Sequence, residues 1–212
     1  MTSNRKELSN RTFSEHAADY DQSPRYATLR TSYPLILAEA LRLPFETILD
    51  VGCGTGALLS LLGQQHKNAK LYGIDISEEM IKASKAKLGS TADLRVSESE
   101  KLPFKRGSFD LVMCTFSFHH HPNPTIVFKE MHRVLSPGGR PIMADPLAPT
   151  PVRQVMNMLI PFMNDGTVHF YSKKEMFELA ASAGLTASKW AKPNRHSYLM
   201  VADRHQAALS PM

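Results

Sequence analysis

The sequence predicts an α/β fold in which a mostly parallel sheet carries helices on both faces. Five short apolar segments alternate with stretches of helical periodicity, the pattern of strands joined by crossover helices. The segment Phe109–Phe116 is apolar almost throughout, as expected of a strand covered on both sides. A glycine-rich turn follows the first apolar segment, Thr47–Val51, and precedes a helical stretch. These observations indicate a doubly wound sheet.

The expected elements follow in order. Residues 1–23 are a polar lead-in, and a helical region then runs from Tyr26 to Leu43, broken or kinked at Pro34. After Thr47–Val51, strands are expected at Lys70–Asp75, Asp93–Ser97, Phe109–Phe116 and Arg140–Asp145. Helices are expected between them at Ala57–Gln65, from Ser77 to Leu88, and at Thr125–Leu135.

The last third of the chain changes character. Val152–Phe162 has the apolar spacing of a helix, and Ser172 with Glu175 forms a capping-box pattern that opens another helix. Leu185–Lys192 and Ser197–Arg204 then predict a hairpin at the sheet edge. The result is a seven-stranded sheet in a single domain over residues 1–212.

Composition limits the classes of protein to consider. Hydrophobic residues make up 42% and charged residues 21%, the balance of a globular domain. No apolar run approaches the roughly 20 residues that span a bilayer, and the first twenty residues lack the apolar stretch of a secretory signal. We therefore expect a cytoplasmic protein with no membrane partner, in which Cys53 and Cys114 are free thiols. The net charge of +5 is scattered and forms no basic stripe, so no nucleic-acid partner is expected.

The turn after the first strand carries the clearest chemical signal. Its glycines at 52, 54 and 56 tolerate positive φ and allow a ligand close to the backbone. The G-x-G-x-G spacing differs from the dinucleotide pattern, and no Gly-Lys-Ser/Thr follows, which excludes a Walker-type phosphate loop. Asp50 precedes the turn and would repel a pyrophosphate, but it can hold a cationic amino group. Asp75 ends the second strand, where an acid reaches ribose hydroxyls in doubly wound folds.

Together these residues resemble the class I S-adenosylmethionine-dependent methyltransferases, and most closely the branch that contains ubiquinone and menaquinone biosynthesis enzymes. The resemblance runs from about Phe13 to Leu185. Its motifs are ILDVGCGTG, GIDISEEM, SESEKLPF, SFDLV, RVLSPGG and the N-terminal FSEHAADYD. It implies a Rossmann-like fold, S-adenosylmethionine (SAM) as cofactor, and methyl transfer to an oxygen, nitrogen or carbon of a small, partly hydrophobic molecule.

The resemblance also implies a set of cofactor-binding residues. Asp75 would bind the ribose, Ile76 and Met80 would flank the adenine, and Tyr20 would close over the cofactor. Glu98 stands where the family usually has an aspartate that faces the adenine amino group, and Ser99 replaces an alanine. The full expected set is Tyr20, Asp50, Gly52, Cys53, Gly54, Asp75, Ile76, Met80, Glu98, Ser99 and Phe116.

Three consecutive histidines follow the fourth strand, at the sheet edge where doubly wound folds bind ligands. His119 and His120 are candidates for a general base or for positioning the acceptor, and Asp145 could orient one of them or bind the substrate. The alternative is that one of the histidines only bonds the backbone. Consecutive side chains diverge, and no cysteine or second histidine group has ligand spacing, so no metal is expected.

Two segments are expected to flank the acceptor site: an N-terminal lid over residues 1–23 and a cap insertion over residues 146–171. The cap carries the soft apolar residues Met156, Met158, Phe162, Met163 and Phe170. A helix that simply packs on the sheet is the alternative for this segment. The chain is expected to be a monomer or a homodimer. Two other functions remain open: a nucleic-acid or protein methyltransferase of the same fold, and a non-catalytic SAM-binding protein.

Overall fold

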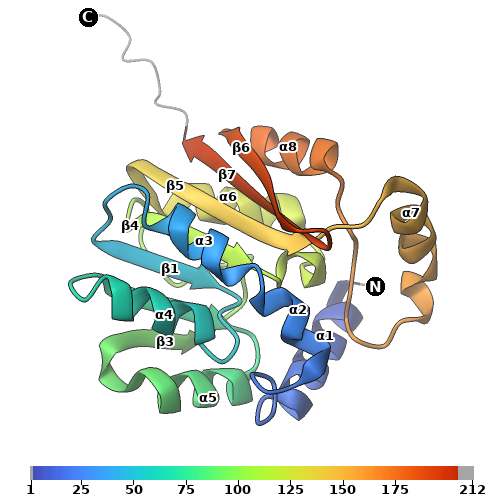
Figure 1. Cartoon of the computed structure of the whole chain (residues 1–212), viewed down its shortest axis with the longest axis horizontal. Coiled ribbons are helices and arrows are strands. Elements are labelled where there is room, and N and C mark those ends of the chain that lie inside the picture. Colours follow the sequence, from blue (N-terminus) through green and yellow to red (C-terminus); the bar gives the residue numbers. More distant parts are fainter. Residues whose placement is uncertain (1, 205–212) are drawn as a thin grey trace, which may run out of the picture.

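The computed structural model describes residues 2–204 and contains one seven-stranded sheet with strand order β3-β2-β1-β4-β5-β7-β6 (Figure 1). The first five strands pair in parallel, whereas β7 runs antiparallel to both β5 and β6. This arrangement confirms the doubly wound, mostly parallel sheet with an edge hairpin. The strands are β1 (Thr47–Val51), β2 (Lys70–Asp75), β3 (Ala92–Val96), β4 (Phe109–Thr115), β5 (Leu135–Pro146), β6 (Leu185–Asn194) and β7 (Ser197–Arg204).

Helices cover both faces of the sheet, as predicted. On one face, α6 and α8 bury Phe128, Met131 and Met176 against strand residues such as Val112. On the other face, α3, α4 and α5 pack against alternate strand residues such as Leu111. The helices are α1 (Thr2–His16), α2 (Ala27–Arg30), α3 (Tyr33–Ala40), α4 (Ala57–Gln65), α5 (Glu78–Leu88), α6 (Pro124–Val134), α7 (Thr150–Leu159) and α8 (Lys173–Ser182). Short 3-10 turns occur at η1 (Pro24–Tyr26), η2 (Gly89–Thr91), η3 (Phe118–His120) and η4 (Ile160–Phe162).

The N-terminal region differs from the prediction. Most of the lead-in is helix α1, which the sequence hid because its residues are largely polar and show little apolar periodicity. The expected helix from Tyr26 to Leu43 is divided into η1, α2 and α3. Pro34 lies in the first turn of α3, where its missing N–H costs nothing, rather than inside a longer helix.

The C-terminal hairpin closes the sheet at one edge. Trp190 on β6 stacks on the fully buried Tyr198 of β7, with ring centroids 4.4 Å apart. Strand β5 starts at Leu135, five residues before the predicted Arg140, because the Pro-Gly-Gly segment continues directly into the strand. Within the described part of the chain, no helix has both the length and the apolar character needed to cross a bilayer.

The strand order places a crevice beside β1. This strand pairs with β2 on one side and β4 on the other, so the connections leaving β1 and β4 diverge at their carboxyl ends. Helices α1, α2 and α7 lie beyond that end of the sheet (Figure 1).

Candidate active site

A cavity of about 1080 Å³, including the space at its open mouth, lies at the carboxyl ends of β1, β2 and β4. Its walls combine the glycine turn, the loops after β2, β3 and β4, and side chains from the first 33 residues. Of the predicted site residues, the cavity wall contains Tyr20, Asp50, Gly52, Cys53, Gly54, Asp75, Ile76, Met80, Ser99, Phe116 and His120.

The glycine turn forms the floor of the cavity. A Cβ on Gly52, whose φ is +77°, would lie 2.3 Å from the Ser117 Oγ, so this position accepts only glycine. A Cβ on Gly54 would meet only the Met80 Sδ at 4.0 Å, which leaves the backbone there open to a ligand. The two requirements differ: the first glycine allows close packing, and the second allows close approach from the cavity.

Asp50 is a buried carboxylate at the end of β1. Its Oδ1 has no hydrogen-bond partner among the described residues, although the side chain lines the cavity. Burial and the neighbouring charge of Asp75 raise the pKa of Asp50 to about 7. A buried oxygen without a partner is costly. The site is therefore complete only when a donor, preferably cationic, enters the cavity.

Asp75 has a different environment. Its Oδ2 accepts the Gly54 N–H at 2.9 Å, and its Oδ1 accepts the Ser77 N–H at 2.9 Å. Burial raises the pKa of Asp75, and these backbone hydrogen bonds oppose the rise. The carboxylate thus ties the glycine turn to the start of α5, while each oxygen keeps a second lone pair for a ligand.

Glu98 does not line the cavity. Its side chain is 55% exposed and forms an ion pair with Lys6 of α1 at 2.8 Å. The next acid, Glu100, does line the cavity and binds the same lysine at 2.6 Å. The structure therefore does not bring Glu98 into the cavity wall with the other predicted cofactor residues, and Glu100 is the acid of this loop that lines the cavity.

The three histidines have three different environments. His119 is buried behind the cavity wall, and its Nδ1 lies 2.8 Å from the Asp145 Oδ1. His120 lines the cavity, with its ring 4.9 Å from that of Phe13 and 4.1 Å from that of His119. The structure thus combines a cavity-facing imidazole with a buried imidazole–carboxylate pair behind it, formed by His119 and Asp145.

His121 is half-buried in the cavity wall, and both of its ring nitrogens have partners. Its Nδ1 lies 2.8 Å from the Ser99 Oγ, and its Nε2 lies 3.5 Å from the Ser117 Oγ. Ser117 also donates to the Val51 carbonyl at 3.1 Å. This chain of contacts joins the loops after β1, β3 and β4. Burial, with smaller effects of nearby His119 and Lys6, lowers the pKa of His121 to about 3, so this ring stays neutral and positions the loops.

Phe116 lines the cavity directly after β4 with a φ of +55°. Among the described residues, it is the only non-glycine residue with positive φ. Such a conformation costs free energy and occurs mainly at functional sites. The Phe116 N–H is held by the Ala144 carbonyl at 2.7 Å, which helps to keep the residue in this conformation.

The N-terminal region closes the opposite wall. Asp21 accepts hydrogen bonds from Thr55, at 2.6 Å, and from Lys87, at 2.5 Å, and so fastens this region to the glycine turn and α5. Tyr20 stacks on Tyr26 with centroids 4.1 Å apart. Sequence reasoning missed several cavity residues here, namely Phe13, Asp21, Tyr26, Arg30 and Tyr33. The signal that could have found the aromatic ones is their repeat with Tyr20 every six or seven residues.

The segment 146–171 lies beside the cavity without lining it. Gly166 packs on the backbone of α1 at Ser9, where a glycine Cβ would lie 2.4 Å from the Ser9 nitrogen. Phe170 stacks on His119 with centroids 5.7 Å apart. The predicted apolar cap residues Met156, Met158, Phe162, Met163 and Phe170 do not form part of the cavity wall.

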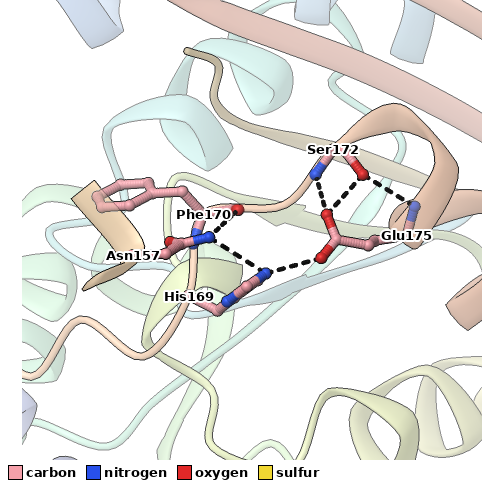
Figure 2. A network of polar contacts seen from close by, with 5 residues as sticks. All are labelled: Asn157, His169, Phe170, Ser172 and Glu175. Carbon is pink, nitrogen blue, oxygen red and sulfur yellow. Dashed lines mark hydrogen bonds and ion pairs between the residues drawn. The ribbon is translucent and has the colours of Figure 1, made fainter. Parts of the chain in front are cut away.

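A polar network holds this segment in place, as Figure 2 shows. Asn157 of α7 accepts the Phe170 N–H at 2.9 Å and donates to the Phe170 carbonyl at 3.1 Å. His169 contacts Glu175 at 2.9 Å, and Ser172 and Glu175 form the predicted capping box. Burial opposes ionisation of Glu175, but hydrogen bonds from Ser172 and His169 lower its pKa to about 2.

The remaining chemistry is limited. Cys53 and Cys114 are both free and buried, as expected, and burial raises the pKa of each thiol. Residues 2–204 contain no group of three or more His, Cys, Asp or Glu side chains that could hold a metal ion.

Comparisons with known proteins agree with this geometry. A family model described as a methyltransferase domain matches residues 49–143. The chain is 31% identical to demethylmenaquinone methyltransferase of Lactococcus lactis over 86% of its own length and 77% of the relative. The chain belongs to the class I SAM-dependent methyltransferases.

Other members of the family are similar over shorter stretches or only in fold. The malonyl-[acyl-carrier protein] O-methyltransferase of Legionella pneumophila is 30% identical over 60% of this chain, and the match spans 45% of that relative. The crystal structure of a SAM-dependent methyltransferase from Aquifex aeolicus shares the fold with a TM-score of 0.72, at 21% identity, over 91% of this chain and 98% of that one.

The cavity fits SAM, the methyl donor of this family. The unpartnered oxygen of Asp50 suits the cationic amino group of the cofactor, and the open backbone at Gly54 allows close approach. Asp75, Ile76 and Met80 line the cavity together, as a nucleoside would require.

Proposed function

We propose that this methyltransferase acts on an oxygen, nitrogen or carbon of a small, partly hydrophobic acceptor. The named relatives act on different acceptors, a demethylated menaquinone in one case and a malonyl group on a carrier protein in the other. The chain spans less than half of the second relative. The proposal therefore names the class of acceptor and leaves the acceptor atom open.

The observation that carries the cofactor side of the proposal, and with it methyl transfer, is the unpartnered Asp50 Oδ1 in the cavity floor. On the cofactor side, Asp50 would bind the amino group and Asp75 would bind the ribose. The backbone at Gly52 and Gly54 would contact the part of the cofactor next to the amino group. The remaining proposed cofactor residues are Tyr20, Cys53, Ile76, Met80, Ser99 and Phe116. Bound SAM supplies an electrophilic methyl group on a positively charged sulfur. The protein supplies position, which is the larger part of catalysis in such a transfer.

On the acceptor side, we assign the cavity-facing role to His120. Where the methyl acceptor carries a proton that must leave, the His120 ring takes up that proton or holds the acceptor group in position. His119, held by Asp145 and packed against His120, is a positioning residue behind it. Residues 1–23 form the lid, since Phe13, Tyr20 and Asp21 reach the cavity from them, and the cap over residues 146–171 supports the lid.

Calorimetry with SAM and S-adenosylhomocysteine tests the cofactor assignment. We expect wild type to bind both ligands and Asp75→Ala to lose at least about tenfold in affinity, or about 1.4 kcal/mol. Asp203→Ala, which removes an exposed aspartate on β7, is the matched control and should bind like wild type. Equal binding by all three proteins would contradict the assignment of Asp75.

A screen of acceptors with isotope-labelled SAM tests the acceptor side. For an acceptor that loses a proton, His120→Gln should lower the turnover rate by about 10²–10⁴-fold. His119→Gln should lower it less and should shift the pH profile, because this change removes the group that holds His120 in place. If His120→Gln retained the wild-type rate and profile with every acceptor, its assigned role would be incorrect.

A further inference from the structure

Helix α7 and the turn η4 present an apolar stripe to solvent. We call these exposed side chains the α7 stripe: Val152, Val155, Met158, Leu159 and Phe162, which are 47–80% exposed. No residue of α7 is buried. Residues three, four and seven apart share one helix face, so these side chains lie together along one side.

The other side of α7 faces the protein and is mixed, with Arg153, Met156 and Asn157 half-buried. Asn157 bonds the Phe170 backbone, and just after the helix Arg5 of α1 donates to the carbonyls of Ile160 and Met163 at 2.8 Å each. A helix on the surface of a globular protein normally buries its apolar face and exposes its polar one. Here most of the apolar side chains of the helix are on the exposed side, and a helix of ten residues gains little stability by itself. The apolar face therefore requires an occupant.

The size of the α7 stripe limits what kind of partner can cover it. The α7 stripe consists of five side chains, whereas a standard protein–protein interface involves about 20–30 residues on each side. A stable interface with a second copy of the chain needs about 800 Å² on each partner. The stripe alone is too small for that, whereas a helix that lies in a lipid interface needs only its own apolar face.

The charge of the region favours a lipid surface. Residues 146–164 contain no aspartate or glutamate, Arg153 lies on α7, and the whole chain carries a net charge of +5. Anionic headgroups attract such a surface and repel one that carries carboxylates. We propose that the α7 stripe docks this methyltransferase on an anionic lipid bilayer, with α7 in the plane of the headgroups. The absence of a spanning segment is compatible with this mode, because an interfacial helix does not cross the bilayer.

The location of the stripe connects it with the active site. The segment behind it packs on α1 at Ser9, and the same helix brings Lys6 and Phe13 to the cavity wall. A bilayer on the stripe would lie next to the lid, where a partly hydrophobic acceptor dissolved in lipid can reach the cavity. This last step rests on the proposed function, whereas the docking itself does not.

Vesicle sedimentation tests the docking without cofactor or acceptor. Wild type should sediment with vesicles of equal parts phosphatidylcholine and phosphatidylglycerol, and more weakly with phosphatidylcholine alone. The double variant Met158→Ser with Phe162→Ser should lose at least about tenfold in partition, because it removes the two most exposed apolar side chains of the stripe. The matched control, Val96→Ser with Ile126→Ser, removes exposed apolar side chains from β3 and α6 and should bind like wild type.

Two results would overturn the proposal. One is wild type that stays in the supernatant with anionic vesicles. The other is a concentration-dependent dimer in analytical ultracentrifugation that only the stripe variant abolishes, which would assign the stripe to a second copy. SAM calorimetry on the stripe variant checks that it is folded, and keeps failure of docking separate from failure of the proposed methyl transfer.

Discussion

The floor of the cavity and its cap are built in opposite ways. Strands β1, β4 and β5 place fully buried side chains on both faces of the sheet, such as Leu49 and Val112 on one face and Ile48 and Leu111 on the other. The cap helix α7 buries none of its residues and is held by a few polar contacts. The floor is therefore continuous with the buried core, whereas α7 can change or open without unfolding the protein.

The largest expected effect is on the floor. Gly52→Ala places a Cβ 2.3 Å from the Ser117 Oγ at a φ of +77°, so it should lower the free energy of unfolding by about 2–3 kcal/mol and abolish SAM binding. Urea unfolding and calorimetry measure the two effects. Gly138→Ala has a similar φ of +81° but open space around it, and should cost only about 1–2 kcal/mol. Equal losses in both variants would show that the clash at Gly52 is relieved.

The next effect concerns the buried carboxylate in that floor. Asp50→Asn should weaken SAM binding by about tenfold or more, because the amide lacks the charge that pairs with an amino group. The same change should stabilise the ligand-free protein at pH 8. Wild-type Asp50 has a folded pKa of about 7, above its unfolded value near 4, so the unfolded state gains stability from ionisation as the pH rises between them.

The ionisation of Asp50 also predicts that SAM binding depends on pH. Asp50 must be ionised to receive a cation, so SAM affinity should fall as the pH drops below about 7, and binding near pH 7 should release a proton. Calorimetry in buffers of different ionisation enthalpy detects that proton. A pH-independent affinity in wild type, with the same profile in Asp50→Asn, would rule out Asp50 as the partner of the amino group.

A smaller effect is expected at His121, in the loop that follows β4 beside the cavity floor. The pKa of His121 is about 3 in the folded protein and about 6.5 when unfolded, so the unfolded state binds more protons between these values. Stability should therefore fall as the pH drops from about 6.5 toward 3, by up to about 1.4 kcal/mol per unit. His121→Gln should flatten this part of the stability–pH curve in urea unfolding. His16→Gln, on the last turn of α1, is the control and should leave the slope unchanged.

The smallest global effect should come from the cap. Asn157→Ala removes both contacts with Phe170 and should cost at most about 1 kcal/mol of global stability. Amide exchange should nevertheless become faster through α7 and residues 164–170. Gln154→Ala, at an exposed position of the same helix, should change neither quantity. A loss of global stability as large as that of Gly52→Ala would mean that the cap is part of the cooperative core.

The same contrast explains what the sequence could predict. The strands and the glycine turn follow from apolar runs and from φ requirements that only glycine meets, so β1, β2 and β4 lie where expected. Helix α1 was missed because it is polar and is held by side-chain contacts from Arg5 and Lys6 to segments more than 90 residues away. Such pairings carry no local pattern and become visible only in three dimensions.

The stacking of Trp190 on Tyr198 has a practical consequence for optical work on this protein. Trp190 is the single tryptophan of the chain, and it lies on β6, four strand positions from β1. At about 4.8 Å per strand, that is roughly 19 Å from the cofactor floor. Its fluorescence should therefore report the undocking of the C-terminal hairpin, and hence unfolding, while remaining nearly silent when a ligand enters the cavity or the cap opens.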